Sequence, residues 1–391
     1  MTLSWAVFAV SLAASVYIYF GYPALIFLVS RLRPRPFRRG GEPTVTVLIP
    51  VYNEEGMIEG KIANTLALDY PPDRLETLVV SDGSTDGTEA IVRRFASEAG
   101  DSVRLLSISR SGKAFALNEG ARAARGEILV LTDANTLLEP GSLRPLVDPF
   151  ADPGVGGVCG NKKQRPPAGA DTTAEGENLY WRWDKWQKAL ESRAGSIFAA
   201  DGTLYAVRKD LYVPIADPAQ ADDIAISARI VLQGRRLLYE PRAVAWEEAP
   251  AEGREEFRRK VRVTNHSVRA LWNLGRGLWT SGFYSVELLS HKFFRHLVPF
   301  FLIPLFLSNA VLAASATGGS PVFRILFAGQ VLFYGLALAG FALRGTRLGR
   351  AKPFTVPYYF CLVNAAAFLG VLSILRGRRL RAWTPRSGLS S

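Results

Sequence analysis

The sequence contains few of the side chains that build disulfide frameworks and structural metal centres. It has two cysteines and three histidines in 391 residues. Cys159 lies in a stretch of mixed charge and Cys361 in a long apolar stretch, which excludes a disulfide framework. His266, His291 and His296 have no partners at the spacing typical of zinc ligands. We therefore expect no structural zinc.

Two common signatures of nucleotide and nucleic-acid binding are also missing. The chain has no Gly-x-x-x-x-Gly-Lys and no Gly-x-Gly-x-x-Gly sequence, so any nucleotide must be bound through other residues. The net charge is +12, but the basic clusters adjoin long apolar stretches and form no basic helix interleaved with aromatic side chains. We expect membrane lipids, and no nucleic acid, as the partners of these clusters.

Charge is scarce in four long stretches. They are Trp5–Leu32, Leu297–Gly318, Val322–Leu343 and Phe354–Leu375. Each reaches the roughly 20 residues that a helix needs to cross a bilayer. The first is expected to be a retained anchor, because no basic residue precedes its apolar core and no clear small-x-small cleavage sequence is present. The sequence thus predicts a membrane protein with a soluble centre.

The basic clusters set the expected topology. Arginines crowd residues 31–39, 344–352 and 376–381, after the first, third and fourth apolar stretches. Such flanks mark the cytoplasmic side, so we expect a multi-pass protein of the cytoplasmic (inner) membrane with its soluble part in the cytoplasm. Strict alternation would put the basic tail outside. Either the tail is outside, or the fourth stretch re-enters or lies partly in the interface.

We divide the chain accordingly. The expected parts are an N-terminal transmembrane helix (1–32), a cytoplasmic domain (40–275), an amphipathic interface helix (280–296), three membrane segments (297–375) and a basic tail (376–391).

Within the soluble part, short apolar runs alternate with helical patterns. The expected strands are 45–51, 75–81, 103–108 and 128–132, and helices are expected at 88–99 and 113–125. This alternation predicts βαβ units and a parallel sheet. The second half is less regular, with helices expected at 175–193, 222–233 and 254–274 and a strand at 236–240.

The most informative motif is Asp133-Ala134-Asn135, which directly follows the fourth expected strand. Ligands of open α/β sheets bind at the carboxyl ends of the strands, where oxygen side chains suit a hard cation. Taken alone, the motif also fits a simple turn. Asp82 stands in the same way at the end of the second strand, before a glycine-containing turn.

Two more acidic motifs follow. Asp201 and Gly202 belong to a turn of small residues that leads into a strand. Asp222 and Asp223 open a helix, where acids favour the helix dipole, but two acids exceed what a cap needs. One of them is a reasonable candidate for a catalytic base.

In order and spacing, these residues resemble the motifs of family 2 glycosyltransferases, which are inverting enzymes with a GT-A fold. The resemblance runs from Val45 to about Arg262 and is greatest to the membrane-integrated branch of cellulose, hyaluronan and chitin-oligosaccharide synthases. It implies an α/β GT-A domain with a Rossmann-like mixed sheet that binds a nucleotide sugar, carried between N- and C-terminal transmembrane helices.

The resemblance also implies roles for individual residues. Asp223 corresponds to the general base, and Asp133 with Asn135 to the motif that binds Mg²⁺ or Mn²⁺ on the diphosphate. The implied donor-binding residues are Pro50, Tyr52, Glu54, Asp82, Lys113, Asp133, Arg259 and Arg262. The implied acceptor-binding residues are Asp201, Gly202 and Asp222.

The chain departs from the family pattern at three positions. Arg259 and Val263 replace the glutamine and tryptophan of Gln-x-x-Arg-Trp, which puts processive synthesis in doubt. Asn135 replaces the second acid of the metal motif and is a weaker, neutral ligand.

The resulting hypothesis is an enzyme that moves a sugar from a UDP-sugar to a saccharide or lipid-linked acceptor, for extracellular or capsular polysaccharide synthesis, with other polysaccharide-assembly proteins as possible partners. One alternative is a polyprenyl-phosphate glycosyltransferase that adds one sugar. Another is a catalytically silent nucleotide-sugar sensor that acts as a membrane scaffold.

Overall fold

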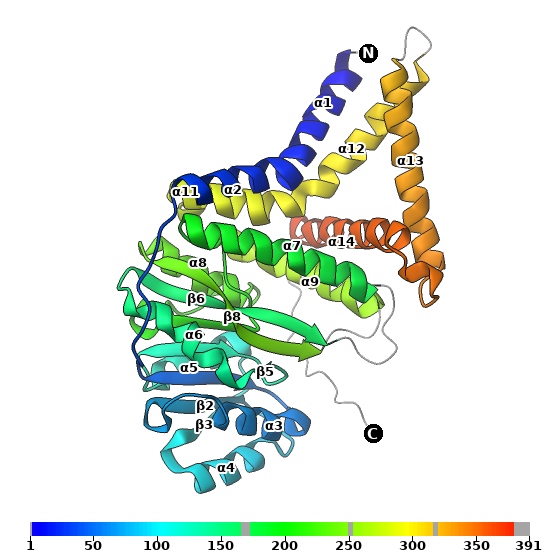
Figure 1. Cartoon of the computed structure of the whole chain (residues 1–391). Coiled ribbons are helices and arrows are strands. Elements are labelled where there is room, and N and C mark those ends of the chain that lie inside the picture. The colour runs from blue at the N-terminus through cyan, green and yellow to red at the C-terminus, as the bar shows by residue number, and fades with distance from the viewer. Residues whose placement is uncertain (1, 166–172, 249–252, 316–319, 379–391) are drawn as a thin grey trace.

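The computed structural model describes residues 2–165, 173–248, 253–315 and 320–378. A sheet-containing domain carries a group of long helices that come from both ends of the chain (Figure 1). Of the expected basic tail, residues 379–391 lie outside the described residues.

In the part of the chain that the structure describes, the domain is built on one eight-stranded sheet in the order β3-β2-β1-β4-β7-β6-β8-β5. The first four long strands run parallel: β1 (Val45–Val51), β2 (Leu75–Asp82), β3 (Val103–Ile108) and β4 (Ile128–Thr132). Every residue of β1 and β4 is buried, which explains their unbroken apolar runs. Side chains alternate between the faces, so Val47 and Leu48 belong to cores on opposite sides of the sheet. The predicted parallel strands are thus confirmed.

Two of the connecting helices, α4 (Thr88–Ala99) and α5 (Lys113–Ala123), are close to the helices predicted at 88–99 and 113–125. The others are α3 (Glu55–Leu66) and the short α6 (Leu143–Val147). These helices place the loops that follow β1, β2 and β4 at one edge of the sheet, where the acidic motifs lie.

The remaining strands include antiparallel pairs, so the sheet as a whole is mixed. β7 (Leu204–Arg208) runs antiparallel to β4 and to β6 (Val155–Arg165), and β6 pairs in parallel with β8 (Arg236–Glu248). The short β5 (Leu137–Leu138) pairs antiparallel with β8. The sequence does not predict β6, because its glycines have low strand propensity. They are needed for packing: a Cβ at Gly160 would lie 2.8 Å from Leu204 Cδ2 and 2.9 Å from the Ala243 carbonyl oxygen.

Three helices lie between the sheet and the apolar helices. They are α7 (Thr173–Ala194), α8 (Asp222–Leu232) and α9 (Gly253–Trp272), followed by the short α10 (Gly277–Thr280). In Figure 1, α7 and α9 run side by side above the sheet.

Among the described residues, four helices are long and apolar enough to cross a membrane. The first comprises α1 (Thr2–Val16), a π-helical turn (Tyr17–Gly21) and α2 (Tyr22–Leu32). The second comprises α11 (Phe283–Glu287), a π-helical stretch (Leu288–Phe293) and α12 (Phe294–Ala314). The third and fourth are α13 (Pro321–Ala342) and α14 (Lys352–Leu375).

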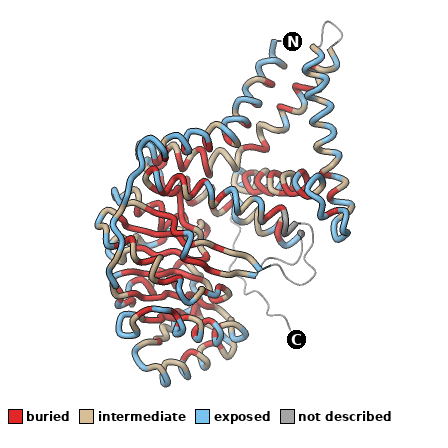
Figure 2. The backbone as a smooth tube through the Cα atoms, in the orientation of Figure 1, coloured by how far each residue is buried: buried red, intermediate tan, exposed pale blue. Residues whose placement is uncertain are grey.

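The last helix differs from the others in its course. α14 runs across the lower end of α13 and alongside α9, and it is much more buried than α13 (Figures 1 and 2). A Cβ at Gly370 would lie 2.6 Å from Thr264 Cβ, so α9 and α14 are in close contact. Beyond α14, the Arg269 guanidinium donates to the carbonyl oxygen of Arg378 at 2.9 Å. The chain therefore returns to the sheet-containing domain after α14.

Candidate active site

The carboxyl edge of the parallel strands borders a polar cavity of about 700 Å³. Six of the eight predicted donor-binding residues line it: Pro50, Glu54, Lys113, Asp133, Arg259 and Arg262. The other lining residues are Arg110–Gly112, Ala114, Ala134, Asn135, 217–220, Asp222, Glu247, Val263 and His266. We call this space the polar cavity.

Tyr52 and Asp82, the other two predicted donor-binding residues, do not line this cavity. The Asp82 carboxylate is buried, where it pairs with Arg110 and accepts the backbone N–H groups of Ser111 at 2.6 Å and Gly112 at 2.9 Å. The Arg110 guanidinium lies 3.6 Å from the centroid of the Tyr52 ring. Asp82 therefore shapes the loop that forms one wall of the cavity.

Lys113, the first residue of α5, lies between two carboxylates in this cavity. Its Nζ is 2.9 Å from Asp133 Oδ1 and 3.0 Å from Asp222 Oδ2. Burial lowers the pKa of Lys113, but the two carboxylates outweigh it and the pKa is raised. Burial likewise raises the pKa of Asp222, but Lys113 outweighs it and the pKa is lowered. Asp222, which the resemblance assigns to the acceptor, thus lies in the polar cavity beside Lys113.

A buried lysine that the sequence does not single out donates hydrogen bonds to both residues that flank the Asp133-Ala134-Asn135 turn. Lys61 of α3 donates to the carbonyl oxygen of Thr136 at 2.5 Å and to Thr132 Oγ1 at 3.2 Å. It lies in an amphipathic helix, and no local pattern marks it as different from a surface lysine.

The same turn offers part of a metal site. Asp133 and Asn135 both line the polar cavity, and the Asp133 side chain is 39% exposed. Among the described residues, no group of three or more His, Cys, Asp or Glu side chains is placed to hold a metal ion. Two hard oxygen donors suit Mg²⁺ or Mn²⁺ when a substrate and water supply the remaining ligands. The residues present therefore fit a cation that is bound together with substrate.

A second cavity of about 970 Å³ lies on the membrane-helix side of the site. Side chains of α7, α9 and the long apolar helices form most of its wall, and Asp201 and Asp223 line it as well. We call this space the apolar cavity. Arg259 and Val263 line both cavities, so the two spaces adjoin at this point of α9. The adjacent acids Asp222 and Asp223 line different cavities.

Asp223 has the properties of a base at neutral pH. Its carboxylate accepts the backbone N–H groups of Ile224 at 2.8 Å and Gly202 at 3.2 Å. Burial, Asp222 and Asp201 raise the pKa of Asp223 to about 6, against the lowering effect of Lys292. Gly202, predicted to contact the acceptor, instead orients this carboxylate and does not line the apolar cavity.

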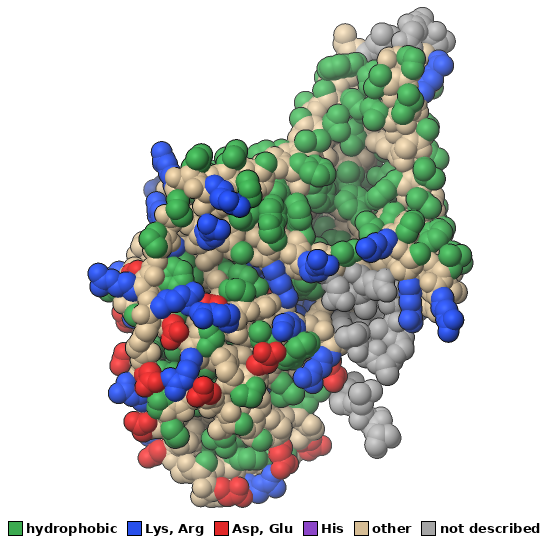
Figure 3. All heavy atoms as spheres, in the orientation of Figure 1, with side chains coloured by type: hydrophobic (Ala, Val, Ile, Leu, Met, Phe, Trp, Pro, Cys, Tyr) green, Lys and Arg blue, Asp and Glu red, His purple; other side chains and the backbone are tan. Residues whose placement is uncertain are grey.

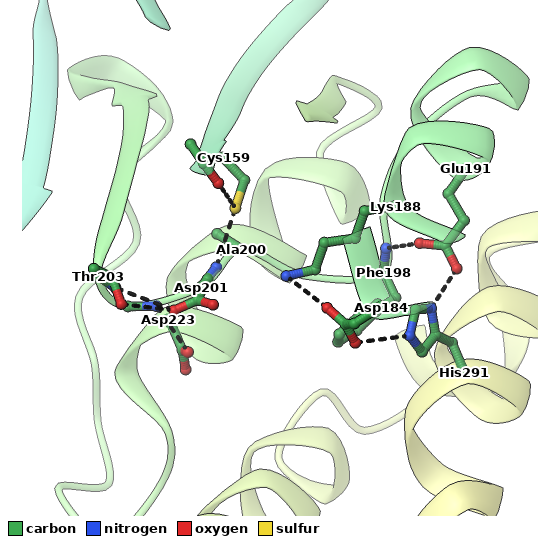
Figure 4. A network of polar contacts seen from close by, with 12 residues as sticks. Cys159, Asp184, Lys188, Glu191, Phe198, Ala200, Asp201, Thr203, Asp223 and His291 are labelled. Carbon is green, nitrogen blue, oxygen red and sulfur yellow. Dashed lines mark hydrogen bonds and ion pairs between the residues drawn. The ribbon is translucent and has the colours of Figure 1, made fainter. Parts of the chain in front are cut away.

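Asp201 lies close to Asp223 in Figure 4, on the turn before β7. Its carboxylate accepts from the Thr203 hydroxyl at 3.0 Å, and its backbone N–H donates to Cys159 Sγ at 3.3 Å. These contacts fix the small-residue turn on which both Asp201 and Gly202 lie.

Arg259 is held rigidly between the cavities. Its guanidinium contacts Glu177 at 2.5 Å and Glu256 at 2.7 Å. Two charge-assisted contacts fix the orientation of the planar group. Arg259 therefore forms a fixed part of the wall, and Arg262 lines the polar cavity one turn further along α9.

A buried polar network joins the membrane helices to α7 (Figure 4). His291 lies between Glu191, at 2.5 Å, and Asp184, at 3.3 Å. The hydroxyl of Tyr22 donates to Glu191 at 2.5 Å, and Lys188 pairs with Asp184 at 3.2 Å. The first and second apolar helices are thereby fixed to the wall of the apolar cavity.

Comparisons with known proteins agree with this geometry. The model of glycosyl transferase family 2 matches residues 46–213. The chain is 29% identical over 213 residues to poly-β-1,6-N-acetyl-D-glucosamine synthase of Staphylococcus aureus strain MSSA476, covering 53% of this chain and 50% of that protein. It is 30% identical over 238 residues to the probable glycosyltransferase YdaM of Bacillus subtilis strain 168, covering 56% and 54%. The chain thus spans about half the length of these curated relatives.

The similarity to one solved structure is more extensive. The mannosyltransferase PcManGT from Pyrobaculum calidifontis, solved in complex with GDP-Man and Mn²⁺, matches with a TM-score of 0.69 and 26% identity. The match covers 95% of this chain and 99% of that one, so it includes the membrane helices. The predicted fold is confirmed: this chain has the GT-A fold, and within it residues 46–213 match the model of glycosyl transferase family 2.

Proposed function

We propose that this protein is a membrane-bound inverting glycosyltransferase that joins a nucleotide-sugar donor in the polar cavity to an acceptor in the apolar cavity. One observation carries the proposal: the two cavities adjoin at Arg259 and Val263, and the neighbouring acids Asp222 and Asp223 serve one cavity each. A single displacement requires this arrangement, since the acceptor hydroxyl and the leaving diphosphate must lie on opposite sides of the anomeric carbon.

In the proposed reaction, an acceptor hydroxyl attacks the anomeric carbon and gives its proton to Asp223. The bond from this carbon to the diphosphate oxygen breaks, and the nucleoside diphosphate leaves with the bonding electrons. Lys113 and Arg262 stabilise the negative charge of the leaving group, and Asp222 holds Lys113 in place. Asp133 and Asn135 would hold Mg²⁺ or Mn²⁺, which when bound neutralises charge on the diphosphate.

The donor is proposed to be a nucleoside-diphosphate sugar. The family resemblance favours a UDP-sugar, and the curated relative is named for a polymer of N-acetylglucosamine. The structural neighbour, in contrast, was solved with GDP-Man. UDP-N-acetylglucosamine and GDP-mannose are therefore the first two donors to test.

We further propose that the catalytic domain faces the cytoplasm and that α14 lies along the membrane interface. α14 packs on α9, and the Arg378 carbonyl oxygen contacts Arg269 of that helix. With α1, α12 and α13 as the crossing helices, Arg376 and Arg378 after α14 lie on the cytoplasmic side. This topology satisfies the positive-inside rule at all three basic clusters.

The product is proposed to be a surface or capsular saccharide of limited length. Val263 stands where the family's polymerising members carry a tryptophan, and it lies on the wall between the cavities. Addition of one sugar is the second candidate, and it is favoured by the same observation.

The test uses the full-length protein in lipid nanodiscs with a membrane lipid extract as acceptor source. Each nucleotide sugar is added with Mn²⁺ or Mg²⁺, and released UDP or GDP is measured. We expect release from one donor, its loss with EDTA, and its restoration by excess metal. A protein that binds no nucleotide would contradict the proposal. A protein that binds a nucleotide but turns over no donor of a wide panel would also contradict it and would favour the sensor alternative.

A further inference from the structure

The apolar cavity has two chemically different ends. At one end it is lined by hydrophobic side chains of the long helices, among them Phe20, Leu302, Phe333 and Val363. Figure 3 shows a hollow lined with hydrophobic side chains between the α12 and α13 sides of the molecule, above α14. At the other end, Asp201 and Asp223 line the cavity. One continuous space thus joins the membrane side to the proposed catalytic base.

Cationic side chains lie between these ends. Lys292 and Arg295 are almost one turn apart on the second long helix, and both line the cavity. Among the described residues, Lys292 has no ion-pair partner, and its ammonium group lies 5.4 Å from the centroid of the Phe198 ring. Arg295 is 3.7 Å from Asp184, but Asp184 also contacts Lys188 and His291. Glu191 is a second acid beside His291, which leaves Asp184 shared between Lys188 and Arg295.

A neighbouring polar atom also has no partner. The Nε2 atom of His296 is buried and, among the described residues, makes no hydrogen bond. His296 lines the same cavity, directly after Arg295. A buried polar atom without a partner destabilises the free protein, so a polar ligand group that bonds to it would remove that penalty.

We propose that the acceptor is a saccharide linked through phosphate to a long-chain lipid. Its phosphate binds Lys292 and Arg295, its hydrocarbon chain lies among α12, α13 and α14, and a sugar hydroxyl reaches Asp223. This inference rests on the proposed function and names the acceptor class of the same site. The cavity volume of about 970 Å³ is at the upper end of the roughly 300–1,000 Å³ typical of ligand pockets.

The position of the acids favours a linked saccharide over a bare lipid phosphate as acceptor. A phosphate nucleophile is already ionised at neutral pH and needs no base, and Asp201 and Asp223 would repel it. A hydroxyl must lose its proton, and Asp223 can accept it. A free saccharide, in turn, has no part that would occupy the hydrophobic end of the cavity.

The experiment measures lipid binding by the full-length protein in phosphatidylcholine nanodiscs, independently of turnover. The three probes are radiolabelled polyprenyl-diphospho-N-acetylglucosamine, polyprenyl phosphate, and a neutral polyprenyl N-acetylglucosaminide. The variants are Lys292→Gln, Arg295→Gln and, as matched control, Arg324→Gln, which removes a cation of α13 that lines neither cavity. UDP and GDP binding is measured on the same samples.

We expect the diphosphate-linked saccharide to bind most tightly and the neutral glycolipid at least tenfold more weakly. Lys292→Gln and Arg295→Gln should each weaken binding of the charged lipids about tenfold and leave nucleotide binding unchanged. Arg324→Gln should change neither lipid binding nor nucleotide binding. Equal binding of the neutral and charged glycolipids would overturn the phosphate site. Tightest binding of bare polyprenyl phosphate would overturn the saccharide. If the unaltered protein binds neither UDP nor GDP, this result would instead refute the proposed function.

Discussion

The two cavities of this protein are built in different ways. The polar cavity is formed by segments of the sheet-containing domain: the ends of β1 and β4, the start of α5, and residues of α8, β8 and α9. The apolar cavity is formed largely by helices from both ends of the chain, so Tyr19 and Phe20 face a space that Phe360 also lines. The proposed donor cavity is therefore built from one continuous domain of the sequence, whereas the proposed acceptor cavity forms only when distant helices pack together.

The charges differ as well. In the polar cavity, Lys113 is already held by two carboxylates, which fixes its position before substrate binds. In the apolar cavity, Lys292 has no ion-pair partner among the described residues. A preorganised cation suits a developing charge, while an unpaired one suits a charge that the ligand itself brings.

The largest effect is expected from Asp223→Asn. The amide keeps the shape of the side chain and cannot take up the acceptor proton, so turnover should fall by about 10²–10⁴-fold. Nucleotide affinity, measured by titration with UDP and GDP, should stay within about twofold, because Asp223 does not line the polar cavity. Asp222→Asn is the matched comparison: it should weaken nucleotide binding through Lys113. Undiminished turnover in Asp223→Asn would refute its assignment as base.

Lys113→Ala should affect the donor side alone. A hydrogen bond to a charged group contributes about 1.5–3 kcal/mol, which corresponds to a loss of about 10–150-fold in nucleotide affinity. The removed lysine also leaves Asp133 and Asp222 facing the diphosphate without their shared cation. Arg122→Gln, on the exposed side of the same helix, is the control and should bind nucleotide normally. Binding of the polyprenyl lipids should not change, and an equal loss at both cavities would argue against their independence.

The dependence of turnover on pH should report on Asp223. Its pKa is raised to about 6 by burial, by Asp222 of the same helix and by Asp201, and is opposed by Lys292. The base must be ionised, so turnover is full above this pKa and falls about tenfold for each pH unit below it. Steady-state rates between pH 4.5 and 8, with nucleotide binding measured in parallel, provide the check. A flat profile in this range would exclude an ionisable base at this position.

The sequence predicts the polar cavity, at the ends of the parallel strands, better than it predicts the apolar cavity. Buried parallel strands have unbroken apolar runs, so β1 to β4 and the acids at their ends can be read directly from the sequence. β6 escapes prediction because its glycines are selected by the close approach of Leu204 and the Ala243 carbonyl group, which involve distant residues. Lys61 escapes it because a lysine in an amphipathic helix is normally exposed, and only the fold buries it below Thr136.

The acceptor side shows why the rest is not predictable. Hydropathy identifies the four long helices, but it cannot distinguish a helix that crosses the membrane from one that packs on a neighbouring domain. The proposed interfacial position of α14 rests on contacts such as Asn265 Nδ2 with Ser373 Oγ, at 2.7 Å, and the close approach of Gly370 to Thr264. The same limit applies to Asp222, whose place beside Lys113 depends on how α8 docks against α5.

The smallest expected effect tests whether the apolar cavity depends on this packing. In Gly370→Ala, the new Cβ would lie 2.6 Å from Thr264 Cβ and 3.0 Å from the Val261 carbonyl oxygen, so α14 must move away from α9. Overpacking of this kind costs about 1–3 kcal/mol. Gly335→Ala in α13 is the control, because no atom lies within 4 Å of its added Cβ.

We expect Gly370→Ala, and not Gly335→Ala, to lower the midpoint of thermal unfolding by a few degrees and to weaken binding of the polyprenyl lipids by severalfold. Nucleotide affinity should be unchanged in both variants, since α14 contributes no residue to the polar cavity. A parallel loss of nucleotide affinity in Gly370→Ala would mean that the donor side also depends on the membrane helices.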